Sequence, residues 1–297
     1  MNENLVFQLN WKLLVCGQVL GRRVFIYSQA DQTGDLNHME KRVKWYVGLS
    51  YFVFWFMVLG LCGTASMVFH CLPVVMRILS NVCAWAPTIV LLIGFKYFCP
   101  DRRIADFYKK AFGGKISIVT LVASAILTLG ATIITVFVLS LIQGKAFGEY
   151  WNLGSYPFWA SFLFSITTGP TGEESGWRGY LRPYLNAKYS FFRASVIQGV
   201  IWAFWHTILW FVDSDYMGIQ MIPYVLSNVI VMTGLCFIMN LFMEKNDNLI
   251  YGIVIHFCFN FLYCFLQVDI WFYVVLSAIY IVIIALICWK KNVMSKE

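Results

Sequence analysis

The sequence is short of charged residues. Only 12% of its 297 residues are Asp, Glu, Lys or Arg, whereas a soluble domain carries about a quarter. Hydrophobic residues make up 60% of the chain and lie in long unbroken runs. This balance excludes disordered, collagen-like, coiled-coil and disulfide-scaffold classes. The runs also argue against a membrane β-barrel, whose strands alternate apolar and polar residues. The sequence therefore predicts an all-α polytopic membrane protein.

Other signals are missing too. The nine cysteines form no CxxC pair and lie mostly within apolar runs, which is typical of small buried hydrophobes rather than of disulfides or a zinc cluster. The first residues lack the basic start and the cleavage site of a signal peptide. The net charge is +7, but the basic residues are spread over short loops. We therefore expect membrane lipid, and no nucleic acid, as a partner.

The apolar runs predict about eight transmembrane helices, since a helix needs about 20 apolar residues to cross the hydrocarbon. Eight spans put both termini on the same side. With cytoplasmic termini, every basic residue except Arg77 and Lys145 falls on the inner side, as the positive-inside rule requires. The fourth span is irregular, because Gly169, Pro170 and Gly172 interrupt it. The predicted spans are 46–70, 80–98, 116–142, 157–182, 192–212, 222–243, 249–267 and 270–289.

Two parts of the chain differ in character. Residues 1–44 interleave apolar and polar residues, which predicts an N-terminal cytoplasmic or interfacial segment. Residues 45–297 are expected to form a single eight-helix membrane domain. The short loops and the lack of a sorting tail favour a multi-pass protein of the cell membrane, of the bacterial plasma-membrane kind.

Ionisable residues inside the predicted spans are functional candidates, because charge in a bilayer is expensive. Glu173, Glu174 and Arg178 lie in the fourth span, His206 in the fifth and His256 in the seventh. Glu174 and Arg178 are four residues apart, which predicts an ion pair on one helical face. Glu173 then points about 100° away from Glu174, free to face a cavity.

Two further pairs share the four-residue spacing, namely Trp202 with His206 and His256 with Asn260. One hypothesis is water activation, since a buried carboxylate such as Glu173 is a stronger base than one in water. An imidazole could share the water, and an imidazole with an amide N–H could hold an oxyanion. The alternative for His256 and Asn260 is a plain interhelical hydrogen bond.

The signatures of other intramembrane hydrolases are absent from the sequence. No H-E-x-x-H zinc helix and no G-x-S-G serine motif occurs. Asp213 and Asp215 lie in a predicted outer loop, so no aspartate pair lies within two spans. The glutamate–histidine arrangement is therefore the remaining candidate for hydrolysis.

Three motifs in order make the chain resemble the CAAX-prenyl endopeptidase and bacteriocin-processing (CPBP, or Abi) membrane proteases. They are E-E-x-x-x-R at 173–178, F-x-x-x-H at 202–206 with Trp202 in place of Phe, and H-x-x-x-N at 256–260. The tryptophan keeps an aromatic wall but adds bulk to the pocket. The resemblance covers roughly residues 115–265, where it implies a catalytic core.

The resemblance implies an intramembrane endopeptidase, a CAAX protease-like hydrolase whose site opens toward the cytoplasm. By the family's scheme Glu173 activates water with His206, whereas His256 and Asn260 stabilise the oxyanion. The supporting residues would be Glu174, Arg178 and Trp202. Some descriptions of the family assign a divalent metal, which would make this a metalloprotease. A zinc ion would then take Glu173, His206 and His256 as ligands. The cofactor is therefore left open as none or one divalent metal ion.

The resemblance leaves the substrate open between a prenylated CAAX peptide and a leader peptide or membrane anchor. Members of the family are also linked to bacteriocin immunity and to scaffolding, so a non-proteolytic membrane partner is the alternative function. A transporter is disfavoured, because no repeated pair of broken helices is seen.

Overall fold

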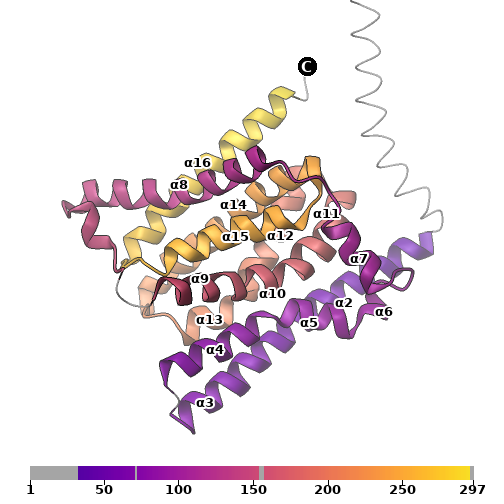
Figure 1. The fold of residues 1–297 in the computed structure, drawn as a ribbon, viewed down its shortest axis with the longest axis horizontal. Coiled ribbons are helices and arrows are strands. Elements are labelled where there is room, and N and C mark those ends of the chain that lie inside the picture. The colour runs from indigo at the N-terminus through magenta and orange to yellow at the C-terminus, as the bar shows by residue number, and fades with distance from the viewer. Residues whose placement is uncertain (1–32, 71, 154–156, 295–297) are drawn as a thin grey trace, which may run out of the picture. The chain divides into compact units, whose positions relative to one another are not determined.

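A computed structural model describes residues 33–294, except 71 and 154–156 (Figure 1). The chain divides into two compact units, residues 1–45 and 46–297. The described part of the first unit is helical and holds an ion pair of 2.8 Å between Lys44 and Glu40. The rest of the predicted N-terminal segment lies outside the described residues, so its place at the membrane interface stays a prediction.

The described residues are almost entirely helical, which confirms the predicted all-α class. Within them, the β-type pairing is one isolated bridge between Trp151 and Leu266. The α-helices are α2 (Thr33–Met57), α3 (Gly63–Met67), α4 (Pro73–Ala84), α5 (Ala86–Ile93), α6 (Phe95–Phe98), α7 (Ile104–Ala111), α8 (Ile118–Gln143), α9 (Phe158–Thr167), α10 (Pro170–Glu174), α11 (Arg182–Lys188), α12 (Phe191–Trp205), α13 (Thr207–Val212), α14 (Met221–Asn246), α15 (Leu249–Tyr263) and α16 (Ile270–Met294). Shorter π- and 3₁₀-helical segments are η1 (Val58–Cys62), η2 (Phe147–Tyr150), η3 (Ser175–Leu181) and η4 (Gly218–Gln220).

Five helical stretches in the described part of the chain are long and apolar enough to cross a membrane. They are His38–Met67, Ile118–Gln143, Phe191–Val212, Gly218–Asn246 and Ile270–Asn292. A sixth span results if α4 and α5 count as one, with a bend of 42° between them, where Pro87 lies in the first turn of α5. The chain is therefore a multi-pass membrane protein.

Two further predicted spans, besides the bent one, differ from continuous helices of full length. The span predicted at 157–182 is divided among α9, α10 and η3, and α15 has 15 residues. At 1.5 Å per residue, a helix of that length falls short of the roughly 30 Å of hydrocarbon. The predicted count of eight spans, with both termini cytoplasmic, therefore stays a prediction.

The long helices of the second unit pack around α14, which contacts α12, α15 and α16 (Figure 1). A Cβ atom on Gly199 of α12 would overlap Thr233 of α14, so this glycine lets the two helices approach closely. The short helix α10 contacts α9, α15 and α5. It therefore lies among helices that are distant from one another in the sequence.

The turn between α14 and α15 is tied to the segment before α8. Asn248 precedes α15, and its side-chain oxygen accepts a hydrogen bond of 3.0 Å from the Ile250 N–H. The Asn248 amide also donates to the carbonyls of Phe112, at 2.9 Å, and Gly114, at 2.6 Å. One asparagine thus starts a helix and joins two loops.

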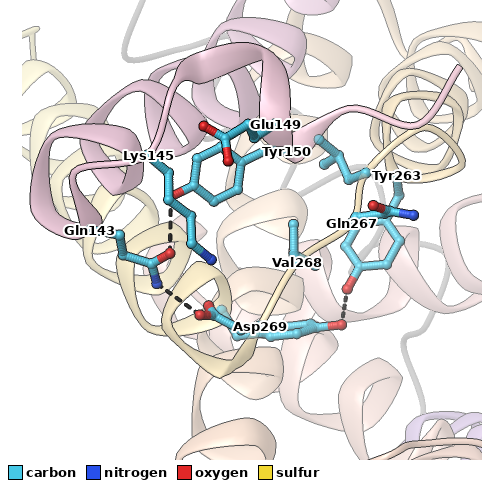
Figure 2. Close-up of a pocket in the computed structure, with 10 residues that line it drawn as sticks. Gln143, Lys145, Glu149, Tyr150, Tyr263, Gln267, Val268 and Asp269 are labelled. Carbon is cyan, nitrogen blue, oxygen red and sulfur yellow. Dashed lines mark hydrogen bonds between the residues drawn. The ribbon is translucent and has the colours of Figure 1, made fainter.

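A pocket of about 610 Å³ lies where the segment after α8 meets the turn between α15 and α16 (Figure 2). The Gln143 amide donates to Asp269 at 2.7 Å, and the Tyr150 hydroxyl donates to Gln143 at 2.9 Å. The two segments are also joined through the backbone, since the Gln267 N–H donates to the Tyr150 carbonyl at 2.9 Å. None of the residues that line this pocket is a predicted site residue.

Candidate active site

The fourth predicted span is broken at Gly169, between α9 and α10. Gly169 has a φ of 101°, a conformation in which residues with a side chain are strained. Pro170 then begins α10, and the Glu173 N–H donates to the Gly169 carbonyl at 2.6 Å. A Cβ atom on Gly169 would lie 2.7 Å from Nε2 of His256. Both conformation and space therefore require glycine here.

Side chains from other helices satisfy the carbonyl groups that this break frees. The Trp85 indole donates to the Thr167 carbonyl at 3.0 Å, and the Asn260 amide donates to the Thr168 carbonyl at 2.9 Å. The Asn81 amide also lies 2.7 Å from the hydroxyl oxygens of both threonines. Because free backbone groups are costly inside a membrane, Trp85 and Asn260 stabilise the break, and Asn81 adds contacts to the two threonine side chains.

Glu173, in the single turn of α10, has two neighbours of different kinds. Its side chain is 3% exposed. Its Oε2 accepts a hydrogen bond of 2.6 Å from the Trp202 indole N–H. Its Oε1 lies 3.9 Å from Nε2 of His206, which is too long for a direct hydrogen bond. Sequence spacing predicts that Glu173 and Glu174 point in different directions, and the structure confirms it.

His206 directly follows α12, and its ring is held in one orientation. Its Nδ1 lies 2.9 Å from the Trp202 carbonyl oxygen. A carbonyl oxygen only accepts, so Nδ1 carries the proton. In the neutral imidazole Nε2 then keeps its lone pair and presents it to Glu173. The predicted juxtaposition of Trp202 and His206 is confirmed, with ring centres 5.7 Å apart.

Glu174 is the centre of a buried charged cluster. Its Oε1 accepts hydrogen bonds from Arg178, at 3.0 Å, and from Nδ1 of His256, at 2.8 Å. The Arg178 guanidinium also donates to the Cys236 sulfur at 3.2 Å and lies 4.0 Å from the Trp202 ring centre. The predicted Glu174–Arg178 pair is thus confirmed. Its burial requires this close pairing, because an unpaired charge there is expensive.

His256 and Asn260 face the same break from α15. Nε2 of His256 points toward Gly169, while the Asn260 amide donates to Thr168. An amide NH₂ has two N–H donors. The second Asn260 N–H has no partner among the described residues, so one donor remains for a ligand.

Known proteins resemble the part of the chain that carries these residues. Residues 155–262 match the family model of Rce1-like type II CAAX prenyl endopeptidases, and that range contains every predicted site residue. This part of the chain is similar to the Rce1-like family. A protein of Methanococcus maripaludis named CAAX prenyl protease 2 is 27% identical over 188 residues, which cover 59% of this chain and 67% of that protein. The resemblance predicted from the three motifs is confirmed.

The three suggested metal ligands, Glu173, His206 and His256, lie near one another. Across the part of the chain that the structure describes, no group of three or more His, Cys, Asp or Glu side chains could hold a metal ion. Nδ1 of His256 binds Glu174, while its Nε2 and Oε1 of Glu173 both approach Gly169, and Oε1 of Glu173 lies 3.9 Å from Nε2 of His206. As placed among the described residues, these side chains do not form a metal site, so no step is derived through one.

Sequence reasoning missed several contacts of the candidate site. Trp202 was expected as an aromatic wall and as a neighbour of His206, but not as the residue whose N–H binds Glu173. Asn81 and Trp85 were not singled out, although both hold the break at Gly169. An asparagine inside an apolar run was the available signal for Asn81. The residues that Trp202, Asn81 and Trp85 contact lie too far along the chain to be found from local spacing.

Proposed function

We propose that this chain is an intramembrane endopeptidase that hydrolyses a peptide bond of a membrane-associated or lipidated peptide or protein. The observation that carries the proposal is the buried pair of Glu173 and His206, with Oε1 and Nε2 3.9 Å apart. This pair lies within a segment that matches a family of CAAX prenyl endopeptidases. A buried carboxylate facing an imidazole is suited to activating water.

In the first step, Glu173 and His206 share the attacking water. Two acceptors 3.9 Å apart are within reach of one water molecule that donates to both. The water oxygen attacks the carbonyl carbon of the scissile bond as Glu173 takes one of its protons. Trp202 keeps the other carboxylate oxygen occupied, so Oε1 is the oxygen that acts as the base.

In the same step, His256 and Asn260 stabilise the oxyanion. Asn260 supplies its second N–H. For Nε2 of His256 to donate, the His256–Glu174 pair must hold two protons, because Nδ1 already shares one with Glu174. The oxyanion then receives one donor from His256 and one from Asn260.

The second step breaks the carbon–nitrogen bond. The proton held by Glu173 passes to the leaving amine, and the oxyanion re-forms a carbonyl as the amine departs. The products are a new carboxyl end and a new amino end, and Glu173 returns to its ionised form. Both proton transfers use Glu173, with His206 holding the water, and the reaction passes through no covalent intermediate with the protein.

The substrate class follows from the apolar setting and from the relatives. CAAX prenyl protease 2 is the name of the relative from M. maripaludis, and a prenylated CAAX peptide is accordingly one candidate substrate. A leader peptide or a membrane anchor is the other. The excess of basic residues in the predicted inner loops supports a site that opens to the cytoplasmic side of a cell membrane.

The test compares the new protein termini that cleavage creates in host membranes with the wild-type chain, with Glu173→Ala and with Glu149→Ala. Glu149 is a carboxylate near the Figure 2 pocket and serves as the matched control. Terminal-peptide mass spectrometry should find ends that vanish in Glu173→Ala and persist in Glu149→Ala. Identical ends in all three membranes, with equal amounts of inserted protein, would overturn the proposal.

The alternative function is that of a non-proteolytic immunity or scaffold protein. Such a protein has no need of charged side chains at a broken membrane helix, so the buried pair favours the protease. The two functions differ in whether the protein still works after Glu173 is replaced. Any host protection that Glu173→Ala retains in full would support the alternative.

A further inference from the structure

We infer that Trp202 is a positioning residue of the proposed protease: its indole N–H fixes the Glu173 carboxylate so that Oε1 faces His206. This inference rests on the proposed function. The hydrogen bond from Trp202 Nε1 to Glu173 Oε2 measures 2.6 Å. It is the one hydrogen bond found to the Glu173 carboxylate among the described residues. Hydrogen bonds to charged groups are shorter and stronger than neutral ones.

The indole itself is held on several sides, so it can act as a rigid support. Trp202 is 1% exposed. The Arg178 guanidinium lies over its ring at 4.0 Å, and the His256 ring meets it edge-on with centres 5.1 Å apart. A donor whose ring cannot move transmits its position to the acceptor. Glu173 is thereby fixed relative to α12 although it lies on α10.

Trp202 also holds the second member of the pair, through its backbone. Its carbonyl accepts the hydrogen bond from Nδ1 of His206 at 2.9 Å, which directs Nε2 toward Glu173. The carboxylate and the imidazole are thus both positioned by one residue. The two atoms that lie 3.9 Å apart are thus each oriented by a contact to Trp202.

The F-x-x-x-H motif has Phe at the position of Trp202, and Phe has no N–H to donate. Without the indole, Oε2 of Glu173 would be buried with no donor among the described residues, and the carboxylate would be free to rotate. Trp202→Phe is therefore a narrow test, because it removes the donor and keeps a ring beside Arg178. The motif's Phe also indicates that the variant can fold.

Trp205 provides the matched control on the same helix. It is fully buried, and its indole donates to the Ser50 carbonyl at 3.0 Å rather than to Glu173. Trp205→Phe thus removes a buried indole donor of the same kind. Any general loss of packing should appear in both variants, whereas a loss of positioning should appear only in Trp202→Phe.

The kinetic test uses the purified full chain in nanodiscs and a synthetic peptide spanning a bond that host membranes cut only when Glu173 is present. We expect Trp202→Phe to lower kcat about 10-fold or more with KM within about twofold, because the loss falls on the chemical step. Trp205→Phe should keep kcat within about twofold. Equal kcat values for the two variants would overturn the positioning role.

A second measurement does not depend on activity. In ¹⁵N–¹H spectra of indole-labelled protein, the Trp202 signal is identified by its absence from Trp202→Phe. A short hydrogen bond to a carboxylate predicts a downfield N–H signal that moves upfield in Glu173→Ala. A signal that stays in place would refute the hydrogen bond. A wild-type chain with no Glu173-dependent cleavage would refute the proposed function and the positioning role together, while the spectrum would still report on the bond.

Discussion

At the scale of single residues, two adjacent carboxylates contact different partners. Glu173 binds Trp202 and faces His206, whereas Glu174 binds Arg178 and His256. Only Glu174 is paired with a permanent charge. The first carboxylate is therefore available for chemistry, and the second mainly supports the structure and orients an imidazole.

These different contacts predict that two conservative substitutions affect different properties, one the cleavage rate and the other the stability. Glu173→Gln should lower cleavage at least about 100-fold, because the general base is lost, and should leave the unfolding temperature close to that of the wild type. Glu174→Gln should reduce the free energy of unfolding by about 3 kcal/mol, because Arg178 keeps a buried charge without its partner. Cleavage assays and thermal unfolding in detergent measure the two effects. Full activity in Glu173→Gln would contradict the first assignment.

Local spacing predicted some of these contacts and could not predict others. Glu174 and Arg178 lie one helical turn apart, so their pairing depends only on helix geometry, even though η3 is a π-helical segment. The contact of Trp202 with Glu173 joins residues 29 positions apart on two helices. It depends on how the helices pack, which spacing within either one does not specify.

At the scale of elements, the break in the fourth span is the feature that positions the site. It leaves α10 a single turn that begins at Pro170 and carries both carboxylates. The sequence indicated the irregularity through Gly169, Pro170 and Gly172. It gave no indication of the residues that stabilise the break, because those lie on α4, at the α4–α5 junction and on α15.

Gly169→Ala should damage both stability and activity. The new Cβ would require a strained φ of 101° and would lie 2.7 Å from Nε2 of His256. Backbone strain alone costs roughly 1–3 kcal/mol, and the displaced imidazole should remove most of the cleavage. Gly130→Ala in α8 is the control, since nothing lies within 4 Å of its added Cβ. Thermal unfolding and cleavage assays should separate the two variants, and equal behaviour would contradict this account.

Asn248→Ala should destabilise the junction of α14, α15 and α8. It removes the helix cap at Ile250 and two donors to the carbonyls of Phe112 and Gly114. With about 1 kcal/mol for a cap and a similar amount for each hydrogen bond, we expect a loss of about 2–3 kcal/mol in unfolding free energy. Asn228→Ala is the control, because that amide donates only to Tyr224 of its own helix. A similar loss in both variants would contradict the role of Asn248.

At the scale of the whole membrane unit, hydrogen bonds join the loops at each end of α8 to other loops, which gives two groups of helix ends. The segment before α8 is joined to the α14–α15 turn through Asn248. The segment after α8 is joined to the turn between α15 and α16 beside the Figure 2 pocket. Since α8 is 26 residues long and separates the two groups, we predict that they lie at opposite faces of the membrane. These contacts are independent of charge, and they agree with the sides that the positive-inside rule assigns to the same loops.

The orientation can be tested with one cysteine at each end of α8, namely Lys115→Cys and Lys145→Cys, both at exposed positions. The positive-inside rule places Lys115 in the cytoplasm and Lys145 outside. A membrane-impermeant maleimide should therefore label Lys145→Cys in intact cells and Lys115→Cys only in inside-out vesicles, above the background of the wild-type chain. The reverse pattern would invert the orientation and place the site's opening on the outer face. Labelling of both from one side would mean that α8 does not cross the membrane, so the division of the helix ends into two faces would fail with it.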